Sequence, residues 1–316
     1  MKDKLSITLI LLSMFLLTQF IGLFVVNAYA PQMVLDPTTG EQIQAPGNNL
    51  PFGLQAQQNE PEPNFFSIVS SFVLAFLLIF FLMKYKWKMV IRLWFLFVVT
   101  LALAITINAI LKYTPLARIS IIALVIAIPL AILKIFKSNR YIHNITEFLI
   151  YPGIAAVFVS ILTWRSILVL LVLISLYDAW AVWKSGIMQK MAKFQMEELK
   201  IFGGFLIPSV SKKVKDQIVK VKQKYKGKKI PKKIQSKKYK VNLAILGGGD
   251  VIFPIITAGV FMRAFGIIPA LFVIFGALAG LSSIFLFSEK GKSYPAMPYI
   301  TTGIFIALLI WKLLFF

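Results

Sequence analysis

The sequence predicts an all-α polytopic membrane protein with nine transmembrane helices, its N-terminus in the cytoplasm and its C-terminus outside. The 316 residues are 59% apolar and only 15% charged, against about 45–50% and about 25% in soluble domains. Long apolar stretches recur along the chain, and Lys and Arg gather in every second connection between them. A water-soluble globule could not bury this much apolar surface, so the soluble classes of protein are excluded.

Nine stretches approach or exceed the roughly 20 apolar residues that a helix needs to cross a bilayer core. They are Leu5–Ala30, Asn64–Met83, Met89–Leu111, Leu116–Leu133, Ile145–Trp164, Ser166–Trp183, Asn242–Met262, Phe265–Phe287 and Pro295–Phe316. The first stretch has Lys2 and Lys4 ahead of it, as a secretory signal would. Its apolar run is longer than the roughly 7–15 residues of a signal peptide, so we expect it to remain as a span.

The orientation follows from the basic residues in the connections. The connection 31–63 contains no Lys or Arg, whereas the connection Lys84–Lys88 contains three Lys. Alternating along nine spans places 29 of the 34 Lys and Arg residues on one side of the membrane. Because connections on the cytoplasmic side are enriched in Lys and Arg, this side is the cytoplasm. An odd number of spans then puts the C-terminus outside, and we expect a multi-pass protein of the cell membrane.

The chain divides into two parts. Residues 1–165 hold the first five spans and an extracytoplasmic loop at 31–63, and residues 166–316 hold spans six to nine and a Lys-rich cytoplasmic loop at 184–240. This loop contains eighteen Lys, no Arg and three acidic residues. Attraction to anionic lipid headgroups, at about 1 kcal/mol per Lys, explains it better than nucleic-acid binding. We expect its run Lys212–Lys240 to be largely disordered. We expect residues 186–205 to form an interfacial helix.

Composition also limits the chemistry. The chain has no cysteine and one histidine, His143. Disulfides, thiolate metal sites, thiol nucleophiles and multi-histidine metal sites are therefore excluded, and we expect no metal and no cofactor. We expect His143 to be a solvated loop residue and Glu147 to lie at the membrane interface.

Two aspartates lie inside predicted spans, Asp178 in the sixth and Asp250 in the seventh. A carboxylate at membrane depth costs about 3 kcal/mol even on the lenient insertion scale, and it usually marks a functional site. Asp178 precedes Lys184 by six residues and Asp250 follows Lys240 by ten. On a helix these separations correspond to roughly 9 and 15 Å, so both carboxylates are expected in the cytoplasmic half, facing each other.

A pair of adjacent carboxylates supports one kind of chemistry without any metal or nucleophile. Two such groups share a proton, so that one acts as general base and the other as general acid. This pair can activate water against an amide and protonate the tetrahedral intermediate. Three glycines before Asp250 and Pro254 after it loosen the helix beside the acid, because glycine is a poor helix former and proline has no N–H.

Three short motifs accompany the two aspartates. They are Tyr177-Asp178 in the sixth span, Gly247-Gly248-Gly249-Asp250 in the seventh, and Pro295-Ala296-Met297 at the start of the ninth. They resemble the YD, GxGD and PAL motifs of the presenilin and signal peptide peptidase family of intramembrane aspartyl proteases. Each motif alone is weak, but the three in this order are specific. The resemblance covers about 167–299, and the span count extends it to the whole chain.

The resemblance implies roles for the residues of these motifs. Asp178 and Asp250 would be the catalytic pair, and the substrates would be single-span transmembrane segments or signal peptides. The site would be shaped, and the substrate seated, by Tyr177, Gly247, Gly248, Gly249, Pro295, Ala296 and Met297. The chain departs from the family in having Met297 where Leu is usual, a swap of similar volume. It also has glycine, at Gly248, in the variable position of the GxGD motif, which affects side-chain preference near the cut. The lack of cysteine and the compact length suggest a microbial homologue.

A second function remains open from the residues alone. Paired intramembrane acids also build the ion pathways of proton- or cation-coupled transporters. Many transporters carry broken helices at matching positions of two repeats. Here the acids and the interrupted helices all lie in the last five spans, with no matching acid in the first four. The sequence therefore favours the protease over the transporter.

Overall fold

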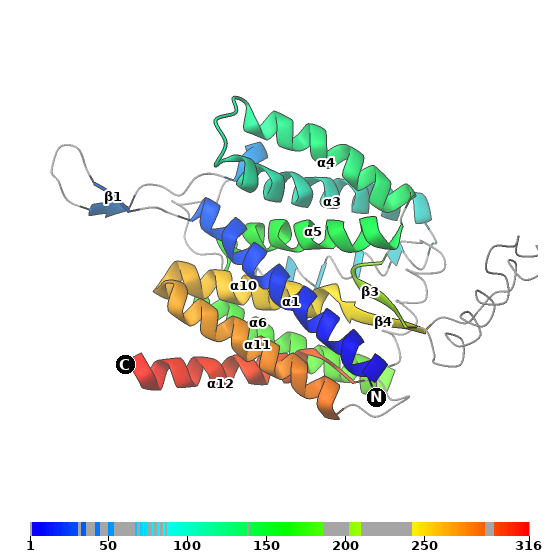
Figure 1. Cartoon of the computed structure of the whole chain (residues 1–316), viewed down its shortest axis with the longest axis vertical. Helices are drawn as coiled ribbons and strands as arrows, with labels where there is room; N and C mark the ends of the chain where they lie inside the picture. The colour runs from blue at the N-terminus through cyan, green and yellow to red at the C-terminus, as the bar shows by residue number, and fades with distance from the viewer. Residues whose placement is uncertain are drawn as a thin grey trace, which may run out of the picture.

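The computed structural model describes residues 2–30, 33–35, 42–44, 50–53, 87–137, 139–185, 202–209, 242–287 and 294–315, with single residues between 67 and 85. Long helices dominate these residues and pack side by side (Figure 1). Their bounds are α1 Lys2–Tyr29, α3 Lys88–Leu111, α4 Ile119–Phe136, α5 Arg140–Ile161, α6 Trp164–Trp180, α10 Gly248–Phe265, α11 Ile267–Phe287 and α12 Met297–Phe315. The N-terminus and the C-terminus lie at opposite ends of the bundle (Figure 1).

Eight helices among the described residues are long and apolar enough to cross a membrane. This confirms the prediction of a helical, multi-pass membrane protein. The second predicted span, Asn64–Met83, lies mostly outside the described residues.

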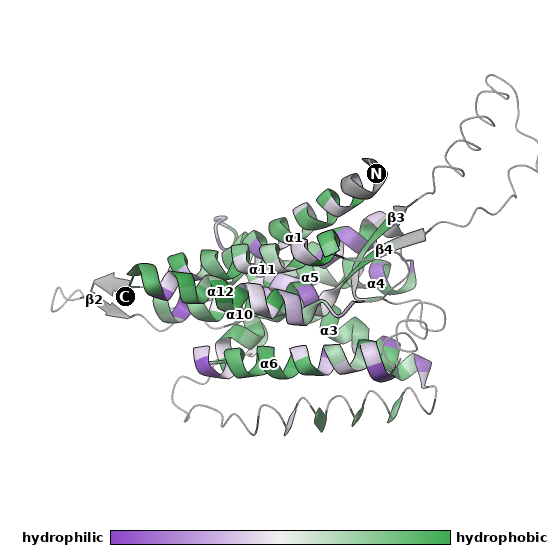
Figure 2. Ribbon diagram, turned by 90° about the horizontal axis from the view of Figure 1, so that it is seen from below, coloured by the Kyte–Doolittle hydropathy of each residue, from purple (hydrophilic) through white to green (hydrophobic). Residues whose placement is uncertain are grey.

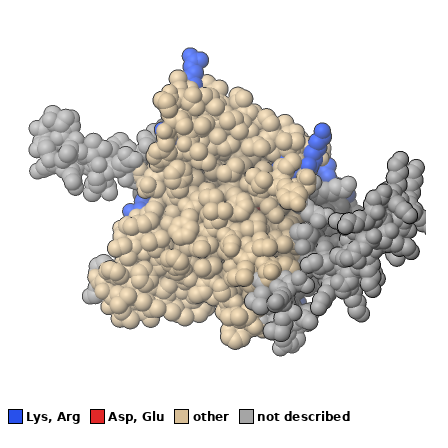
Figure 3. All heavy atoms as spheres, viewed as in Figure 1, with Lys and Arg blue, Asp and Glu red and all other residues tan. Residues whose placement is uncertain are grey.

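The outer surface of the bundle is apolar. Large hydrophobic side chains such as Leu286 (79% exposed) and Leu313 (75% exposed) face outward. The helices are predominantly green, that is hydrophobic, in Figure 2. In the view of Figure 3, Lys and Arg atoms are confined to the periphery of the face. Such a surface is stable when hydrocarbon surrounds it and not when water does.

The first helix lies within the bundle, against α5 and α10. Gln19 is fully buried, and its side-chain amide donates to the main-chain oxygen of Val251 in α10 (3.1 Å). One turn further along α1, a side chain at Gly22 would collide with Ile255, which also belongs to α10. The first stretch is therefore an integral part of the fold and contacts the helix that carries Asp250.

Helices α1 and α3 run in the same direction, because their C-terminal ends meet. The Tyr29 hydroxyl donates to the main-chain oxygen of Ile105 (2.8 Å). The Lys112 ammonium donates to the main-chain oxygen of Ala28 (2.8 Å) and lies over the Tyr29 ring. A cation at the C-terminus of α1 also interacts favourably with the helix dipole.

One predicted span is wrong over its first six residues. Asn242–Gly247 is a strand, β4, which pairs antiparallel with β3, Gly204–Ser209, so that Gly204 lies opposite Gly247. A short apolar run ended by glycines cannot be assigned to helix or strand by its periodicity, which explains the error. Strand β3 lies within the Lys-rich loop 184–240 but before Lys212–Lys240, the run predicted to be disordered, which lies outside the described residues. The predicted interfacial helix is wrong at 202–205, where the chain is extended or irregular, and its residues 186–201 lie outside the described part.

Two further short strands, β1 (Met33–Leu35) and β2 (Gln42–Gln44), pair antiparallel in the predicted outer loop 31–63. A single 3₁₀ turn, η1, follows at Pro51–Gly53.

The predictions for His143 and Glu147 are also wrong. Helix α5 begins at Arg140, five residues earlier than the predicted span, so both residues lie inside it. Their exposed fractions are 4% and 1%. Lys134 of α4, which the charge count had assigned to a connection, is likewise buried, and its ammonium lies 2.6 Å from the Glu147 carboxylate.

Helices α11 and α12 approach each other through glycines. A Cβ on Gly303 of α12 would collide with the main-chain oxygen of Gly276 in α11, and a Cβ on Gly280 would collide with that of Tyr299. Small residues allow close packing of membrane helices, where van der Waals contact replaces the hydrophobic effect. This contact determines where the first turn of α12 lies relative to the rest of the bundle.

We expect Gly303→Ala to lower the melting temperature, because the added methyl group forces α11 and α12 apart at a cost of about 1–3 kcal/mol. Thermal unfolding of the purified protein in detergent measures the effect. Thr302→Ala is the matched control, since the Thr302 hydroxyl bonds only to Pro298 of its own helix. Equal melting temperatures for the two variants would contradict this packing.

Candidate active site

Asp178 lies near the end of α6, where the helix changes its winding. The next residues, Ala181–Ser185, form a π-helical turn (η2), and the Ala181 N–H bonds to the main-chain oxygens of both Tyr177 and Asp178. Such π turns inside helices are frequent at functional sites. The Asp178 side chain is only 8% exposed.

The Asp178 carboxylate is held by the N-terminus of another helix. Its Oδ2 accepts a hydrogen bond from the main-chain N–H of Met297 (3.0 Å), the first residue of α12. This N–H has no partner within its own helix, and the positive end of the helix dipole favours an anion. One turn away, the Ser175 hydroxyl donates to the Thr301 hydroxyl (2.7 Å). Two hydrogen bonds therefore join α6 to α12.

Asp250 lies in the first turn of α10, with Gly247 as the N-cap residue. Its carboxylate accepts a hydrogen bond from the Gly247 main chain. This contact is the acidic half of a capping box, in which the third residue of a helix reaches back to the N-cap N–H. Asp250 is thus at the beginning of a helix, and not ten residues along one as the predicted depth assumed.

The three glycines before Asp250 have different environments. A Cβ on Gly247 would lie 2.9 Å from Asp250 Oδ2. A Cβ on Gly248 would lie 3.2 Å from both the Gly203 main-chain oxygen and the Tyr151 ring. Gly249 is exposed, and a Cβ there would make only an ordinary contact with the Phe253 ring (3.9 Å). Steric reasons for glycine therefore apply at Gly247 and Gly248.

The fold brings the two aspartates together. Helices α6, α10 and α12 are in mutual contact, and Asp178 interacts electrostatically with Asp250. Each carboxylate lies at the N-terminus of a helix, so main-chain N–H groups stabilise charge on both. A water molecule between two such groups could be deprotonated by one of them while the other protonates a carbonyl oxygen.

The remaining predicted residues surround this pair to different extents. Pro295 and Met297 are buried and Ala296 is half-buried in the segment that leads into α12. Ala296 accepts a hydrogen bond from the Ile300 N–H (3.1 Å), which closes the first turn of α12. Tyr177 points outward, is 43% exposed, and its ring lies 6.3 Å from the Trp180 ring.

No group of three His, Cys, Asp or Glu side chains that could hold a metal ion occurs in the described part of the chain. The positioning role of Ser175 and Thr301, and that of the β3–β4 hairpin, was not predicted. The only sequence signal for Ser175 is its place one turn before Asp178. The sequence gives no signal for the hairpin, because a long loop separates its two strands.

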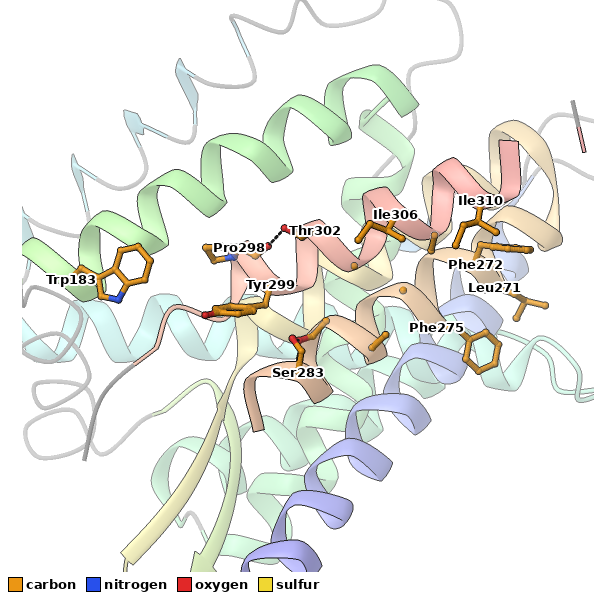
Figure 4. A pocket seen from close by; sticks show the side chains of 15 residues that line it. Trp183, Leu271, Phe272, Phe275, Ser283, Pro298, Tyr299, Thr302, Ile306 and Ile310 are labelled. Carbon is orange, nitrogen blue, oxygen red and sulfur yellow. Dashed lines mark hydrogen bonds between the residues drawn. The ribbon is translucent and has the colours of Figure 1, made fainter. Parts of the chain in front are cut away.

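A large apolar groove lies on the other face of α12. It has a volume of about 960 Å³ and runs between α11 and α12, from Trp183, Pro298 and Tyr299 to Ile310 (Figure 4). Neither aspartate lines it. Its walls are hydrocarbon apart from a few hydroxyls, as expected for a surface in contact with lipid.

Comparisons with known proteins agree with the geometry. The family model described as "Signal-peptide peptidase, presenilin aspartyl protease" matches residues 50–316. Two solved structures of a presenilin family intramembrane aspartate protease, in C222 and P2 space groups, share the fold with TM-scores of 0.60 and 0.55. Both are 18% identical to the chain; the first match covers 97% of this chain and 99% of the other, and the second covers 96% of each. No curated protein sequence matches. The chain therefore belongs to the signal-peptide peptidase and presenilin family of aspartyl proteases.

Proposed function

We propose that this protein is a GxGD-type intramembrane endopeptidase in which Asp178 and Asp250 are the catalytic pair. One observation carries the proposal: the two acids come from different helices that contact each other, and each carboxylate faces the N-terminus of a helix. The substrates are single-span transmembrane segments or signal peptides, and the reaction requires no cofactor.

The reaction needs one proton between the two carboxylates. The ionised aspartate takes a proton from water, whose oxygen adds to the scissile carbonyl carbon, while the protonated aspartate gives its proton to the carbonyl oxygen. The resulting diol then collapses. One hydroxyl proton returns to an aspartate, the other aspartate protonates the amide nitrogen, and the C–N bond breaks. The pair ends with the single proton with which it began.

The β3–β4 hairpin supports a route for presenting the substrate. Leu206 of β3 uses both its main-chain groups to bond the Asn144 side chain of α5 (3.0 Å each), so these groups point away from β4. In an antiparallel pair the opposite residue, Ile245, must then direct its own N–H and C=O outward from β4. A substrate helix has to unwind before its amides can react, and an unwound segment can pair with such an edge. The edge ends three residues before Asp250.

The directions of the helices support nine spans. Helices α1 and α3 run in the same direction, and the predicted span Asn64–Met83 would supply the crossing that this direction calls for. The excess of Lys and Arg supports a cytoplasmic N-terminus and a cytoplasmic position for the hairpin. This orientation resembles that of presenilins, so the substrates have their N-terminus outside, and the cell membrane is the expected location. The transporter alternative is not supported, because the family is one of proteases.

We expect Asp178→Asn and Asp250→Asn each to lower cleavage of a labelled single-span peptide by about 10³-fold or more, because the amide cannot exchange a proton. The assay uses detergent-purified protein, with circular dichroism to check folding. Asp36→Asn, in the outer loop, is the control and should retain activity. Robust cleavage by either active-site variant would refute the catalytic pair.

Inhibition should separate this mechanism from metal catalysis. We expect peptides with a hydroxyl in place of the scissile carbonyl to inhibit, because they resemble the tetrahedral diol. Chelators should leave the rate unchanged, and both effects are measured with the same peptide assay. Loss of activity with a chelator and recovery with zinc would overturn the assignment.

Sealed, right-side-out vesicles test the orientation. We expect external protease to leave the Lys-rich loop 184–240 intact and to cut it only after the membrane is permeabilised. Single-span substrates with the N-terminus outside should be cleaved and inverted versions should not. Cleavage of the loop from outside would reverse both expectations.

A further inference from the structure

A buried polar cluster on α4 and α5 has no role in the reaction described above. Lys134, His143 and Glu147 are each no more than 5% exposed. The Lys134 ammonium lies 2.6 Å from Glu147 Oε1, and His143 Nε2 lies 3.6 Å from the same oxygen. Charged groups buried in this way cost stability unless they are paired. The other contacts of these residues therefore indicate what the cluster supports.

The side of α5 that carries the cluster bonds to strand β3. His143 Nε2 lies 2.8 Å from the Gly204 main-chain oxygen, and since a carbonyl oxygen only accepts, this nitrogen carries the hydrogen. The Asn144 amide donates to the Leu206 oxygen, and its oxygen accepts from the Leu206 N–H. The Asn144 side chain thus bonds β3 as the peptide group of a neighbouring strand would.

The bonds made by α5 continue to Asp250 through a few main-chain contacts. Gly203, beside β3, accepts a hydrogen bond from the N–H of Gly248 (3.1 Å), two residues before Asp250. From the next turns of α5, the Tyr151 ring packs edge-on against Phe205 of β3 and against Gly248. A slip of β3 would therefore displace both the outward edge of β4 at Ile245 and the first turn of α10.

The Lys134–Glu147 ion pair explains how His143 and Asn144 are held in position. Glu147 lies one turn after His143 on α5, so its carboxylate is beside the imidazole, and Lys134 ties it to α4. A buried, hydrogen-bonded polar network of this kind favours one arrangement of the helices over others. The cluster thus fixes the rotation of α5 that aims His143 and Asn144 at β3.

We propose that Asn144 and His143 are positioning residues that fix the register of β3, and through it the distance between the β4 edge and Asp250, so that they select which peptide bond is cut. The claim that these residues select the peptide bond rests on the proposed proteolytic function. The claim that they fix the register of β3 is independent of it. Displacement of a substrate by about 1 Å can slow a reaction by about 10²-fold. Two measurements address the two parts separately.

The first measurement reads the register directly. The chain has no cysteine, and Leu206 and Ile245 form a pair without hydrogen bonds between them, whose short Cα separation suits a disulfide. We expect Leu206→Cys with Ile245→Cys to cross-link fully, and Leu206→Cys with Leu243→Cys, the register shifted by two, not to. In the Asn144→Ala background the shifted pair should cross-link as well. If only the native pair forms, the proposal is refuted.

The second measurement maps the cut positions by mass spectrometry. We expect Asn144→Ala to spread the cuts over neighbouring bonds and to lower kcat by about 10- to 100-fold with a smaller change in KM. His143→Gln, which keeps a donor for Gly204, should retain the wild-type pattern, and His143→Leu should not. Thr106→Val is the matched control, because it removes a bond from α3 to α5 (2.6 Å to the Leu149 oxygen) without touching β3.

The outcomes are distinguishable. An unchanged set of cut positions in Asn144→Ala, whatever the loss of rate, would show that Asn144 is merely structural and overturn the proposal. If Asn144→Ala does not fold, Asn144→Asp, which keeps the bond to the Leu206 N–H and loses the other, must give the same shift. If the wild-type protein cuts nothing, the proposed function fails, and the cross-linking still decides whether Asn144 sets the register.

Discussion

The proposed mechanism requires two carboxylates to be held side by side in a place where a bilayer leaves little water to solvate them, and the rest of the structure bears on how this is done. Each acid is placed at the beginning of a helix, where main-chain N–H groups have no partner within the helix. Met297 serves Asp178 in this way and Gly247 serves Asp250. The arrangement uses main-chain N–H groups in place of a basic side chain, and it requires α12 and α10 to begin at the same depth.

This requirement explains packing that is otherwise far from the acids. The depth of α12 is set by its close contact with α11, where Gly276 and Gly303 let the two backbones meet. The depth of α10 is set by the hairpin that precedes it, and the hairpin is bonded to α5 through Asn144. Glycine contacts and side-chain bonds to the backbone thus carry out the positioning that a large apolar core carries out in a soluble enzyme.

The sequence predicts the elements that the bilayer imposes and misses those that tertiary contacts impose. Long apolar runs identify eight of the described helices, and charge at membrane depth identifies Asp178 and Asp250. Strand β4 was missed because its short apolar run, Leu243–Leu246, satisfies either periodicity, and its partner lies across a long polar loop. Burial of His143 was missed because the start of α5 is polar, and a polar residue near a span end is usually solvated. Only the contacts of His143 with Glu147 and with β3 reverse that expectation.

The burial of α1 has a consequence for how the chain is made. Gln19 bonds the main chain at Val251, 232 residues later. Contacts of such separation form late, because most of the chain must be synthesised before either side can use them. During biosynthesis the first helix therefore has to stay close by in the membrane, with a buried amide unmatched, until α10 is inserted. Asp178 takes its hydrogen bond from Met297 at the start of the last helix, so the surroundings of both aspartates are completed only when the end of the chain has been inserted.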